Sequence, residues 1–272
     1  MVVGGRDQAP IKNFDYVYAS AGPTGFNKAM PATVTPRKQR KTPPARQRRR
    51  GARRFKFAAA ILIAPAVLFY GFVFVGLLLF RSVNPATTAV QVERRLTAWM
   101  TGKPYVKRYR YVPLNAISTN LARAVTSAED ARFYQHAGFD WKEVDNAIHE
   151  DLENGRRRGA STIDQQLVRN LFLSTAPSIV RKALEFSIVP LEEMVLPKRR
   201  ILELYLNVVE WGPGVYGAEA AAEFYYRLPA RSLSRQRALE LASILPAPLH
   251  RRPGQTEWYV RRIDARMHEV GW

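Results

Sequence analysis

A carboxylate pair in the middle of the chain stands among residues that suit acid–base chemistry. The stretch 128–141 reads AEDARFYQHAGFDW and places Glu129 where a helical pattern gives way to a loop, followed by Asp130, Phe133 and His136. A carboxylate set among aromatic groups can have its pKa raised by desolvation, which suits a general base near neutral pH. The alternative interpretation is that Glu129 and Asp130 are solvated charges at a helix end, and the residues alone leave both interpretations open.

A second stretch combines a turn of small residues with positive charge. Residues 156–170 read RRRGASTIDQQLVRN. A Gly-Ala-Ser-Thr turn that leads into a helix offers free backbone N–H groups, which form a ready phosphate site. Gln165 and Gln166 add two amide side chains near the start of this helix. The alternative is an ordinary capped helix whose arginines form a solvated face.

The third stretch, residues 181–207, pairs basic and acidic residues at helical spacing. Arg181 and Lys182 precede Glu185 by one turn. A surface ion pair at this spacing, worth roughly 0.2–0.5 kcal/mol, is the structural alternative to a functional site. Glu203 lies among leucines, and we interpret it as a structural brace. The glycine-rich turn 211–217 allows the backbone to approach either a ligand or a neighbouring helix.

Other catalytic constellations do not occur in the sequence. The chain has no cysteine and no GxSxG elbow, and its four histidines form no HExxH or similar ligand set, so we expect no metal site built from them. Carboxylates and cations are the groups that are available for catalysis. They indicate glycosyl or phosphoryl transfer.

The elements that must position these residues are mainly helices. Residues 82–115 are predicted to be irregular because Pro85, Pro104 and Pro113 interrupt any long helix there. Apolar residues then recur at helical spacing almost to the end of the chain. Pro190 is predicted to kink or end the helix that holds Glu185. Helix starts are predicted at capping or proline positions: Thr162 with Gln165 in a capping box, Ser178, Pro197 and Ser234.

One segment is apolar enough to cross a membrane. The 24 residues from 57 to 80 carry no charge. Roughly 20 apolar residues span a hydrocarbon core about 30 Å thick, so we interpret 57–80 as an uncleaved transmembrane helix. The basic cluster 46–56 precedes it and Arg81 alone follows, which places the N-terminus in the cytoplasm and residues 81–272 outside.

The N-terminal segment accounts for much of the net charge of +19. Residues 1–56 carry 14 Lys and Arg against Asp7 and Asp15, and we interpret them as a disordered cytoplasmic tail. Adjacency to the membrane favours a role in topology and in contacts with anionic lipid over nucleic-acid binding.

Five stretches in order resemble the motifs of the peptidoglycan glycosyltransferase family, a lysozyme-like, largely α-helical domain also found in bifunctional penicillin-binding proteins. They read AEDARFYQHAGFD, RGASTIDQQLVRN, RKALE, KRRILELYLN and WGPGVYGAEAAAEFYY. The resemblance implies a mainly α fold, with the glycosyltransferase domain at 114–272 after a membrane-proximal linker at 81–113. Since the chain ends at Trp272, we expect no transpeptidase domain and a monofunctional enzyme.

The resemblance also implies a reaction and its residues. Lipid II would be the acceptor, and the growing strand, held to undecaprenol by a pyrophosphate, would be the donor. Glu129 would deprotonate the acceptor 4-hydroxyl for an inverting β-1,4 transfer, and Glu185 would help undecaprenyl diphosphate leave, directly or through a bound cation. The implied substrate-binding residues are Asp130, Phe133, His136, Gly159, Ser161, Thr162, Gln165, Gln166, Arg169, Asn170, Arg181 and Lys182.

Cofactors, partners and location follow from the same resemblance. No tightly bound cofactor is implied, and Mg²⁺ or Mn²⁺ is the divalent cation that would accompany the substrate diphosphate. The expected location is the inner membrane, crossed once, with the catalytic domain in the periplasm. Other penicillin-binding proteins and division or elongation proteins are the expected protein partners, and nucleic acid is not expected.

Three positions depart from the family pattern. Arg169 stands where the family usually has Lys, which keeps the charge but changes its shape. Residues 173–178 lack an arginine that many relatives carry, so one diphosphate contact is missing from the pattern. Pro190 interrupts a helix that is often continuous in relatives.

Three other functions fit parts of the sequence. A degradative muramidase or lytic transglycosylase would share the fold and a catalytic glutamate but would not need the arginine-rich second motif. An inactive scaffold that binds lipid II would not need both Glu129 and Glu185. A membrane-tethered nucleic-acid binder would rest on the basic tail alone.

Overall fold

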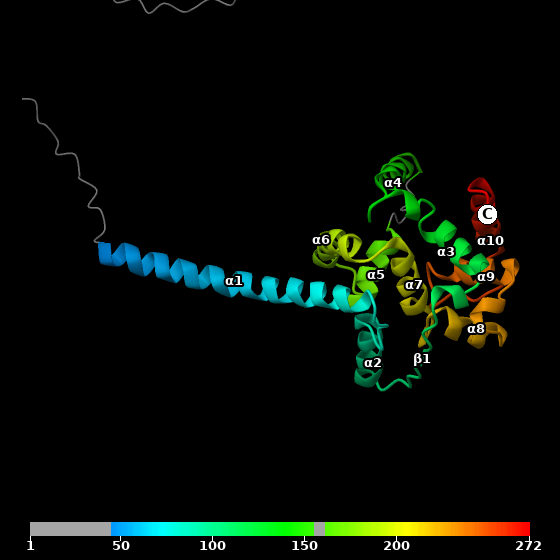
Figure 1. Cartoon of the computed structure of the whole chain (residues 1–272), viewed down its shortest axis with the longest axis horizontal. Helices are drawn as coiled ribbons and strands as arrows, with labels where there is room; N and C mark the ends of the chain where they lie inside the picture. Colours follow the sequence, from blue (N-terminus) through cyan, green and yellow to red (C-terminus); the bar gives the residue numbers. More distant parts are fainter. Residues whose placement is uncertain (1–44, 155–160) are drawn as a thin grey trace, which may run out of the picture. The chain divides into compact units, whose positions relative to one another are not determined.

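The structure is a computed structural model that describes residues 45–154 and 161–272. The described residues are mainly helical, as predicted, with one small sheet (Figure 1). The α-helices are α1 (Ala45–Phe80), α2 (Ala89–Met100), α3 (Thr119–Glu129), α4 (Trp141–Asn154), α5 (Ile163–Phe172), α6 (Ile179–Val195), α7 (Lys198–Val208), α8 (Ala218–Tyr226), α9 (Arg235–Ile244) and α10 (Glu257–Glu269). The strands are β1 (Arg108–Tyr109), β2 (Glu210–Gly212) and β3 (Val215–Tyr216), and the 3₁₀ turns are η1 (Leu114–Ala116), η2 (Phe133–Gln135) and η3 (Ala230–Ser232).

Helix α1 contains the segment that was predicted to span a membrane. Its stretch Ile63–Phe80 is long and apolar enough to cross a bilayer. The helix begins at Ala45, so it includes residues 45–56, which the sequence analysis assigned to a disordered tail. Residues 1–44 of that tail lie outside the described residues.

The C-terminal turns of α1 pack against α5 and α6. Val73 and Leu77 are fully buried, in contrast to the exposed apolar residues earlier in the helix. A Cβ atom on Gly76 would lie 2.9 Å from the Phe172 ring. The absence of a side chain at Gly76 therefore lets α1 pack closely against Phe172 of α5. The hydroxyls of Tyr70 and Ser187 are hydrogen-bonded at 2.6 Å. These contacts join the end of the apolar helix to the domain that follows it.

Helix α5 lies at the centre of the domain, with α2, α6 and α7 packed around it (Figure 1). Leu167 and Val168 of α5 and Ile201 and Leu204 of α7 are fully buried. A second group of helices, α3, α9 and α10, packs mutually through other apolar faces. Because α3 ends at Glu129 and α5 begins at Ile163, the two groups bring the first and second motifs together.

The segment 82–115 is more regular than predicted. It contains α2, which is capped by Thr88 and packs on α5, and it also contains β1. The prediction of irregular chain was wrong because Pro85 and Pro104 flank the helix and do not interrupt it. Glu93 of α2 accepts hydrogen bonds from the backbone N and the hydroxyl of Thr175.

Helix α6 continues through Pro190. Of the two predicted outcomes at this proline, a kink or an end, the end was wrong, since α6 runs from Ile179 to Val195. Buried residues stand on both sides of the proline, including Val189 and Glu192. Packing of this face therefore outweighs the loss of one backbone donor, which costs about 3 kcal/mol in an unsupported helix.

The glycine-rich turn 211–217 forms part of the sheet, whose strand order is β1-β3-β2. Gly214 has φ +74°, and a Cβ atom there would lie 2.3 Å from the carbonyl oxygen of Val106. The backbone N–H of Arg108 donates to the carbonyl of Gly214 at 2.7 Å. The close neighbour of this turn is therefore the strand segment that precedes η1, and the turn is structural.

Most predicted helix starts are confirmed. Thr162 and Gln165 form the reciprocal capping box, and the side chains of Ser178 and Ser234 cap α6 and α9. Pro197 precedes α7 by one residue and does not occupy its first turn.

Candidate active site

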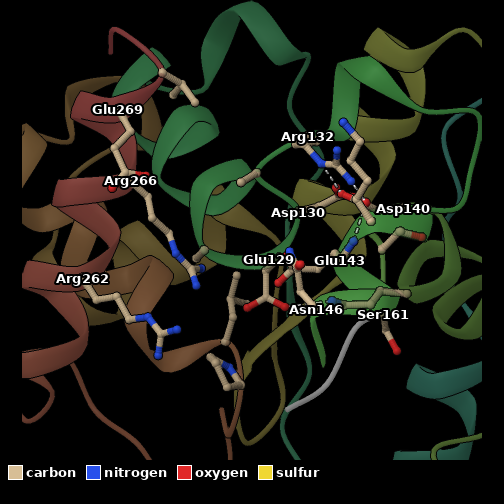
Figure 2. Close-up of a pocket in the computed structure, with 18 of the residues that line it drawn as sticks. Glu129, Asp130, Arg132, Asp140, Glu143, Asn146, Ser161, Arg262, Arg266 and Glu269 are labelled. Carbon is tan, nitrogen blue, oxygen red and sulfur yellow. Dashed lines mark hydrogen bonds and ion pairs between the residues drawn. The ribbon is translucent and has the colours of Figure 1, made fainter. Parts of the chain in front are cut away.

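A cavity of about 970 Å³ opens in front of Glu129 (Figure 2). Helix α4 and the start of α5 line one side of it, and α10 lines another. Its lining is rich in charged groups of both signs: Glu129, Asp130, Arg132, Asp140, Lys142, Glu143, Asp145, Arg169, Arg262, Arg266 and Glu269. Such a lining suits a large polar substrate.

Glu129 is the last residue of α3 and projects into this cavity. Its Oε2 accepts a hydrogen bond from the Gln166 Nε2 at 2.8 Å, whereas its buried Oε1 has no partner among the described residues. Burial raises the pKa of Glu129, and the Gln166 hydrogen bond and the positive charge of Arg169 oppose that rise. A carboxylate with a raised pKa and one unpaired oxygen has the properties of a general base.

Asp130 ties the loop after α3 to the start of α5. It is buried, its Oδ1 is 2.9 Å from the Nε2 of His136, and its Oδ2 accepts from the backbone N–H of Ile163 at 3.0 Å. A carboxylate at a helix N-terminus is stabilised by the helix dipole. Asp130 and His136 therefore fix the position of Glu129 relative to α5.

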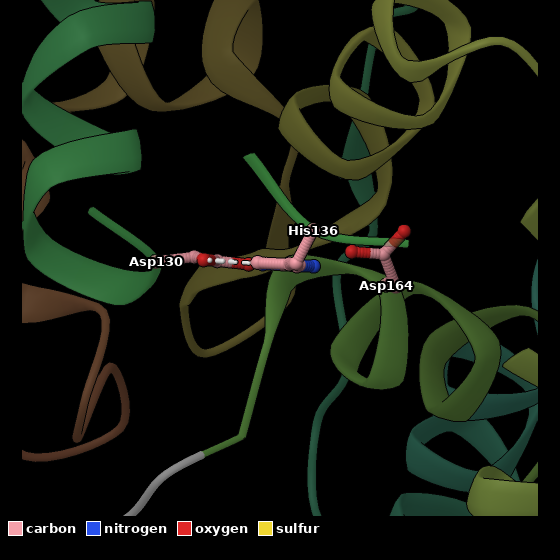
Figure 3. A group of neighbouring side chains, drawn as sticks. All are labelled: Asp130, His136 and Asp164. Atoms are coloured by element: carbon pink, nitrogen blue, oxygen red, sulfur yellow. Dashed lines mark hydrogen bonds and ion pairs between the residues drawn. The ribbon is translucent and has the colours of Figure 1, made fainter. Parts of the chain in front are cut away.

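Asp130, His136 and Asp164 form a cluster in which the imidazole ring lies between the two carboxylates (Figure 3). One donor atom from each residue lies within 4.8 Å of the others, so the structure assembles a group that the sequence analysis did not expect. Most of the donors are engaged within the protein, since Lys198 bonds both oxygens of Asp164 at 3.1 and 3.2 Å and Asp130 bonds the Nε2 of His136. The buried Nδ1 of His136 has no hydrogen-bond partner among the described residues. We interpret the cluster as a structural one.

The start of α5 is held by reciprocal hydrogen bonds. The Thr162 hydroxyl donates to the carbonyl of Gly138 at 2.7 Å and accepts from the N–H of Gln165. The Gln165 Oε1 accepts from the Thr162 N–H at 3.2 Å. Thr162 thus joins the first motif to the second.

Glu185 lies in a separate buried cluster on α6. Its exposed fraction is 2%, and its carboxylate is paired with Arg181 and, at 3.0 Å, with Lys182. The Lys182 Nζ also donates to the Ser161 Oγ at 3.0 Å and to the Gln165 Oε1 at 3.3 Å. Through Ser161, which lines the cavity, this basic cluster adjoins the start of α5.

The comparisons with known proteins identify the family of this chain. The family model described as Transglycosylase matches residues 93–270. The chain belongs to the transglycosylase family.

Individual relatives agree with the family match. The chain is 42% identical over 196 residues to the biosynthetic peptidoglycan transglycosylase of Neisseria meningitidis serogroup C (strain 053442), covering 72% of this chain and 84% of the relative. It is 45% identical over 190 residues to the protein of that name in Laribacter hongkongensis (strain HLHK9), covering 70% and 83%. The Neisseria gonorrhoeae protein of the same name is 41% identical over 196 residues, covering 72% of this chain and 84% of the relative.

The predicted site residues of this transglycosylase divide into two groups. Those that line the cavity are Glu129, Asp130, Ser161, Thr162, Gln166 and Arg169. Those that do not line it are Phe133, His136, Gln165, Asn170, Arg181, Lys182 and Glu185. Gly159 lies outside the described residues.

Several of the second group support other residues. Phe133 is fully buried, with the Lys198 Nζ 4.3 Å from its ring centroid. The Asn170 amide donates to the backbone carbonyl of Gln166 at 2.8 Å. Phe133 and Asn170, which were predicted to bind substrate, are therefore buried and contact other protein groups.

The structure also adds cavity residues that sequence reasoning missed. Tyr259, Arg262 and Arg266 come from α10, and Figure 2 shows both arginines directed toward the side of the cavity that holds Glu129. Arginines one helical turn apart were visible in the sequence, but the surface on which α10 packs was not.

Proposed function

We propose that this chain polymerises lipid II into the β-1,4-linked glycan strands of peptidoglycan and releases undecaprenyl diphosphate. Membership of the transglycosylase family and relatives named biosynthetic peptidoglycan transglycosylases support this function. The observation that carries the mechanism is the single unpaired oxygen of Glu129 in a large charged cavity.

In the proposed reaction Glu129 is the general base. Its Oε1 takes the proton from the 4-hydroxyl of the acceptor, while Oε2 stays bonded to Gln166. The acceptor oxygen forms a bond to the anomeric carbon of the donor with inversion, and the bond from that carbon to the diphosphate breaks. The electron pair of the broken bond leaves with undecaprenyl diphosphate.

The leaving diphosphate is assigned to the basic side of the site. Arg181 and Lys182 surround Glu185, and Lys182 also contacts Ser161. Cations placed where negative charge develops lower the barrier of such a transfer. The Arg169 guanidinium lines the cavity and adds a further positive charge.

The carboxylate oxygens of Glu185 do not fit the role of ligands for a resident divalent cation. Both carboxylate oxygens are already paired, one with Arg181 and one with Lys182. An Mg²⁺ or Mn²⁺ ion would have to displace a cationic side chain. We therefore assign charge neutralisation to the side chains and derive no step through a metal.

The proposed membrane location is supported by α1. Its apolar stretch 63–80 would anchor the domain at the surface where lipid-linked substrate and product stay. The proposed location is the inner membrane, with the N-terminus in the cytoplasm and the catalytic domain in the periplasm, because the basic cluster precedes the span. Penicillin-binding proteins and division or elongation proteins remain the proposed partners.

Polymerisation of labelled lipid II by the purified full-length chain in detergent tests the function. We expect the wild type to form long strands that lysozyme digests, and Glu129→Gln to lose at least ~100-fold in kcat, because general bases contribute about 10²–10⁴-fold. The matched control is Glu223→Gln, which changes an exposed glutamate on α8 and should polymerise at the wild-type rate.

Three outcomes would contradict the proposal. Polymer from Glu129→Gln would remove Glu129 from the role of base. Lipid II binding without polymer from the folded wild type would indicate a scaffold. Release of soluble fragments from finished peptidoglycan sacculi would indicate a lytic enzyme.

A further inference from the structure

A chain of hydrogen bonds links Glu129 to the protein core. Tyr205 of α7 is fully buried, and its hydroxyl lies 2.9 Å from the Oε1 of Gln166 on α5. The other end of the same amide, Nε2, lies 2.8 Å from the Oε2 of Glu129 on α3. Three helices thus contribute one side chain each to a continuous path.

The direction of each hydrogen bond in this path is determined by the chemistry of its ends. An ionised carboxylate accepts hydrogen bonds but cannot donate, so the NH₂ group of Gln166 must face Glu129. The amide oxygen then faces Tyr205, whose hydroxyl donates to it. The reversed amide would place its oxygen against the carboxylate and leave the tyrosine proton without a nearby acceptor among the described residues.

The backbone of Gln166 is also held in place. Its N–H donates to the carbonyl of Thr162 at 3.0 Å, and its carbonyl accepts from the Asn170 amide at 2.8 Å. The side-chain amide is held by Glu129 at its nitrogen and by Tyr205 at its oxygen, so both partners restrict its rotation. Leaving a buried hydroxyl without an acceptor is unfavourable, so Tyr205 favours one orientation of the amide.

We propose that Tyr205 is a positioning residue for glycosyl transfer, which fixes the Gln166 amide so that it donates to Glu129 and leaves Oε1 for the acceptor hydroxyl. The inference rests on the proposed function. Tyr205 belongs to the fourth motif and is buried. It would therefore act on the chemistry through Gln166 without touching the substrate. It also predicts that Tyr205 favours the ionised form of the base.

Tyrosine suits this role because burial, followed by the nearby charge of Glu129, raises the pKa of Tyr205 well above its ordinary value. The hydroxyl therefore remains a donor throughout the working pH range. Phenylalanine would fill nearly the same space but could not orient the amide.

Other charges face Glu129 from every neighbouring element, and they would remain when Tyr205 is changed. Asp130 raises the pKa of Glu129, whereas Arg169 and Arg251 lower it. Three residues of α10 also lie near this site. Burial, followed by the charge of Glu129, raises the pKa of Tyr259. Arg262 lines the same cavity, and the Nη1 of Arg266 donates a hydrogen bond to the carbonyl of Ser127. A change in pH profile on loss of one neutral hydroxyl would therefore report on the hydrogen-bond path.

The test is Tyr205→Phe in the full-length chain, assayed with lipid II across pH. We expect kcat to fall about tenfold at neutral pH with little change in KM, the size expected for a hydrogen bond that supports a charged group. The acidic limb of the kcat/KM profile should move upward by about one pH unit, because the ionised base loses support.

A double-mutant cycle separates this role from simple packing. Gln166→Met should produce the same upward movement of the acidic limb, and Tyr205→Phe should have no further effect on that limb in the Gln166→Met background. The matched control is Tyr225→Phe, which removes a hydroxyl that donates to the carbonyl of Trp211 at 2.9 Å and should leave the pH profile unchanged.

An unchanged acidic limb in both Tyr205→Phe and Gln166→Met would overturn the inference, as would equal losses from Tyr205→Phe in the two backgrounds. If Tyr205→Phe does not fold, an unchanged acidic limb in Gln166→Met still overturns the inference, because the path from Tyr205 runs through Gln166. Wild-type protein that makes no polymer would instead refute the proposed function, so the two failures are distinguishable.

Discussion

At the scale of single residues, burial sets the acid–base properties of the site region. Glu129 has its pKa raised by burial yet keeps one hydrogen-bond donor, from Gln166. Glu192 of α6 is fully buried, and neither of its carboxylate oxygens has a partner among the described residues. The first environment leaves a carboxylate able to exchange a proton, whereas the second favours a carboxyl that stays protonated.

The group around Glu192 links stability to pH. Burial, followed by the charge of Asp164, raises the pKa of Glu192 well above its ordinary value, and burial with the Glu193 hydrogen bond raises the pKa of Asp164 to about 7. The folded state then binds more protons than the unfolded chain between pH ~4 and pH 7. The contribution of these groups to stability is therefore full below pH ~4. It is lost as pH rises through about 7 for Asp164 and through the raised pKa of Glu192.

We expect Glu192→Gln, which is neutral at every pH, to raise the free energy of unfolding at pH 8 by about 1–3 kcal/mol. The gain should shrink at pH 5, where the wild-type carboxyl is already protonated. Denaturant unfolding at several pH values measures this difference, and Glu223→Gln serves as the exposed control. A variant that is less stable than wild type at pH 8 would show that the ionised carboxylate is stabilised.

At the scale of elements, caps and packing decided the helix boundaries. Thr162 and Gln165 form a capping box that could be predicted from their spacing alone, since the pattern is local. Pro190 and the prolines around α2 misled the prediction, because a local rule cannot include the packing of the buried face. Local chemistry thus predicted where helices start better than where they continue.

The cap at Thr162 has a role beyond α5. Its hydroxyl bonds the carbonyl of Gly138 in the first motif, so Thr162→Ala should remove both a cap and a link between motifs. We expect a loss of about 1–2 kcal/mol in unfolding free energy together with lower kcat. Thermal unfolding and lipid II polymerisation measure the two effects.

Ser234→Ala is the matched control for Thr162→Ala. It removes the cap of α9, whose serine accepts from the N–H of Arg237. This variant should lose comparable stability while kcat stays near the wild-type value. Equal losses of kcat in the two variants would mean that Thr162 acts only through stability.

At the scale of the whole molecule, the apolar helix is both an anchor candidate and a packing partner. Val73 and Leu77 of α1 are fully buried against the domain, and the rings of Phe72 and Phe80 contact Phe172. Removing α1 would expose the apolar surface that these residues cover. The helix therefore contributes to the stability of the domain that it would hold at a membrane.

We expect a chain that starts at Arg81 to unfold at a lower temperature than the full-length protein in the same detergent, because burial of apolar side chains is lost. It should also polymerise lipid II in vesicles more slowly. Differential scanning calorimetry measures the unfolding temperature, and a vesicle assay measures the rate of polymerisation. An unchanged unfolding temperature would mean that the contacts of Val73 and Leu77 add no stability.

The amino-acid sequence by itself determined the apolar span, the caps and the five ordered motifs, because each depends on neighbours within a few residues. It therefore identified Glu129 and Glu185 as candidates and the family to which the chain is similar. The spacing of Arg181, Lys182 and Glu185 left open a surface ion pair as the alternative to a functional site. The structure contains the ion pairs but buries Glu185.

Only the tertiary structure decided which motif residues share a cavity and which are buried beneath it. Tyr205 reaches Gln166 across 39 positions, and Tyr259 of α10 lies near Glu129 across 130, distances in sequence at which no local pattern reports contact. Burial of Asp164 and Glu192 likewise depends on how helices pack, and it changes the charge that each carboxyl can hold. The physical reason is that desolvation and hydrogen-bond direction depend on neighbours in space.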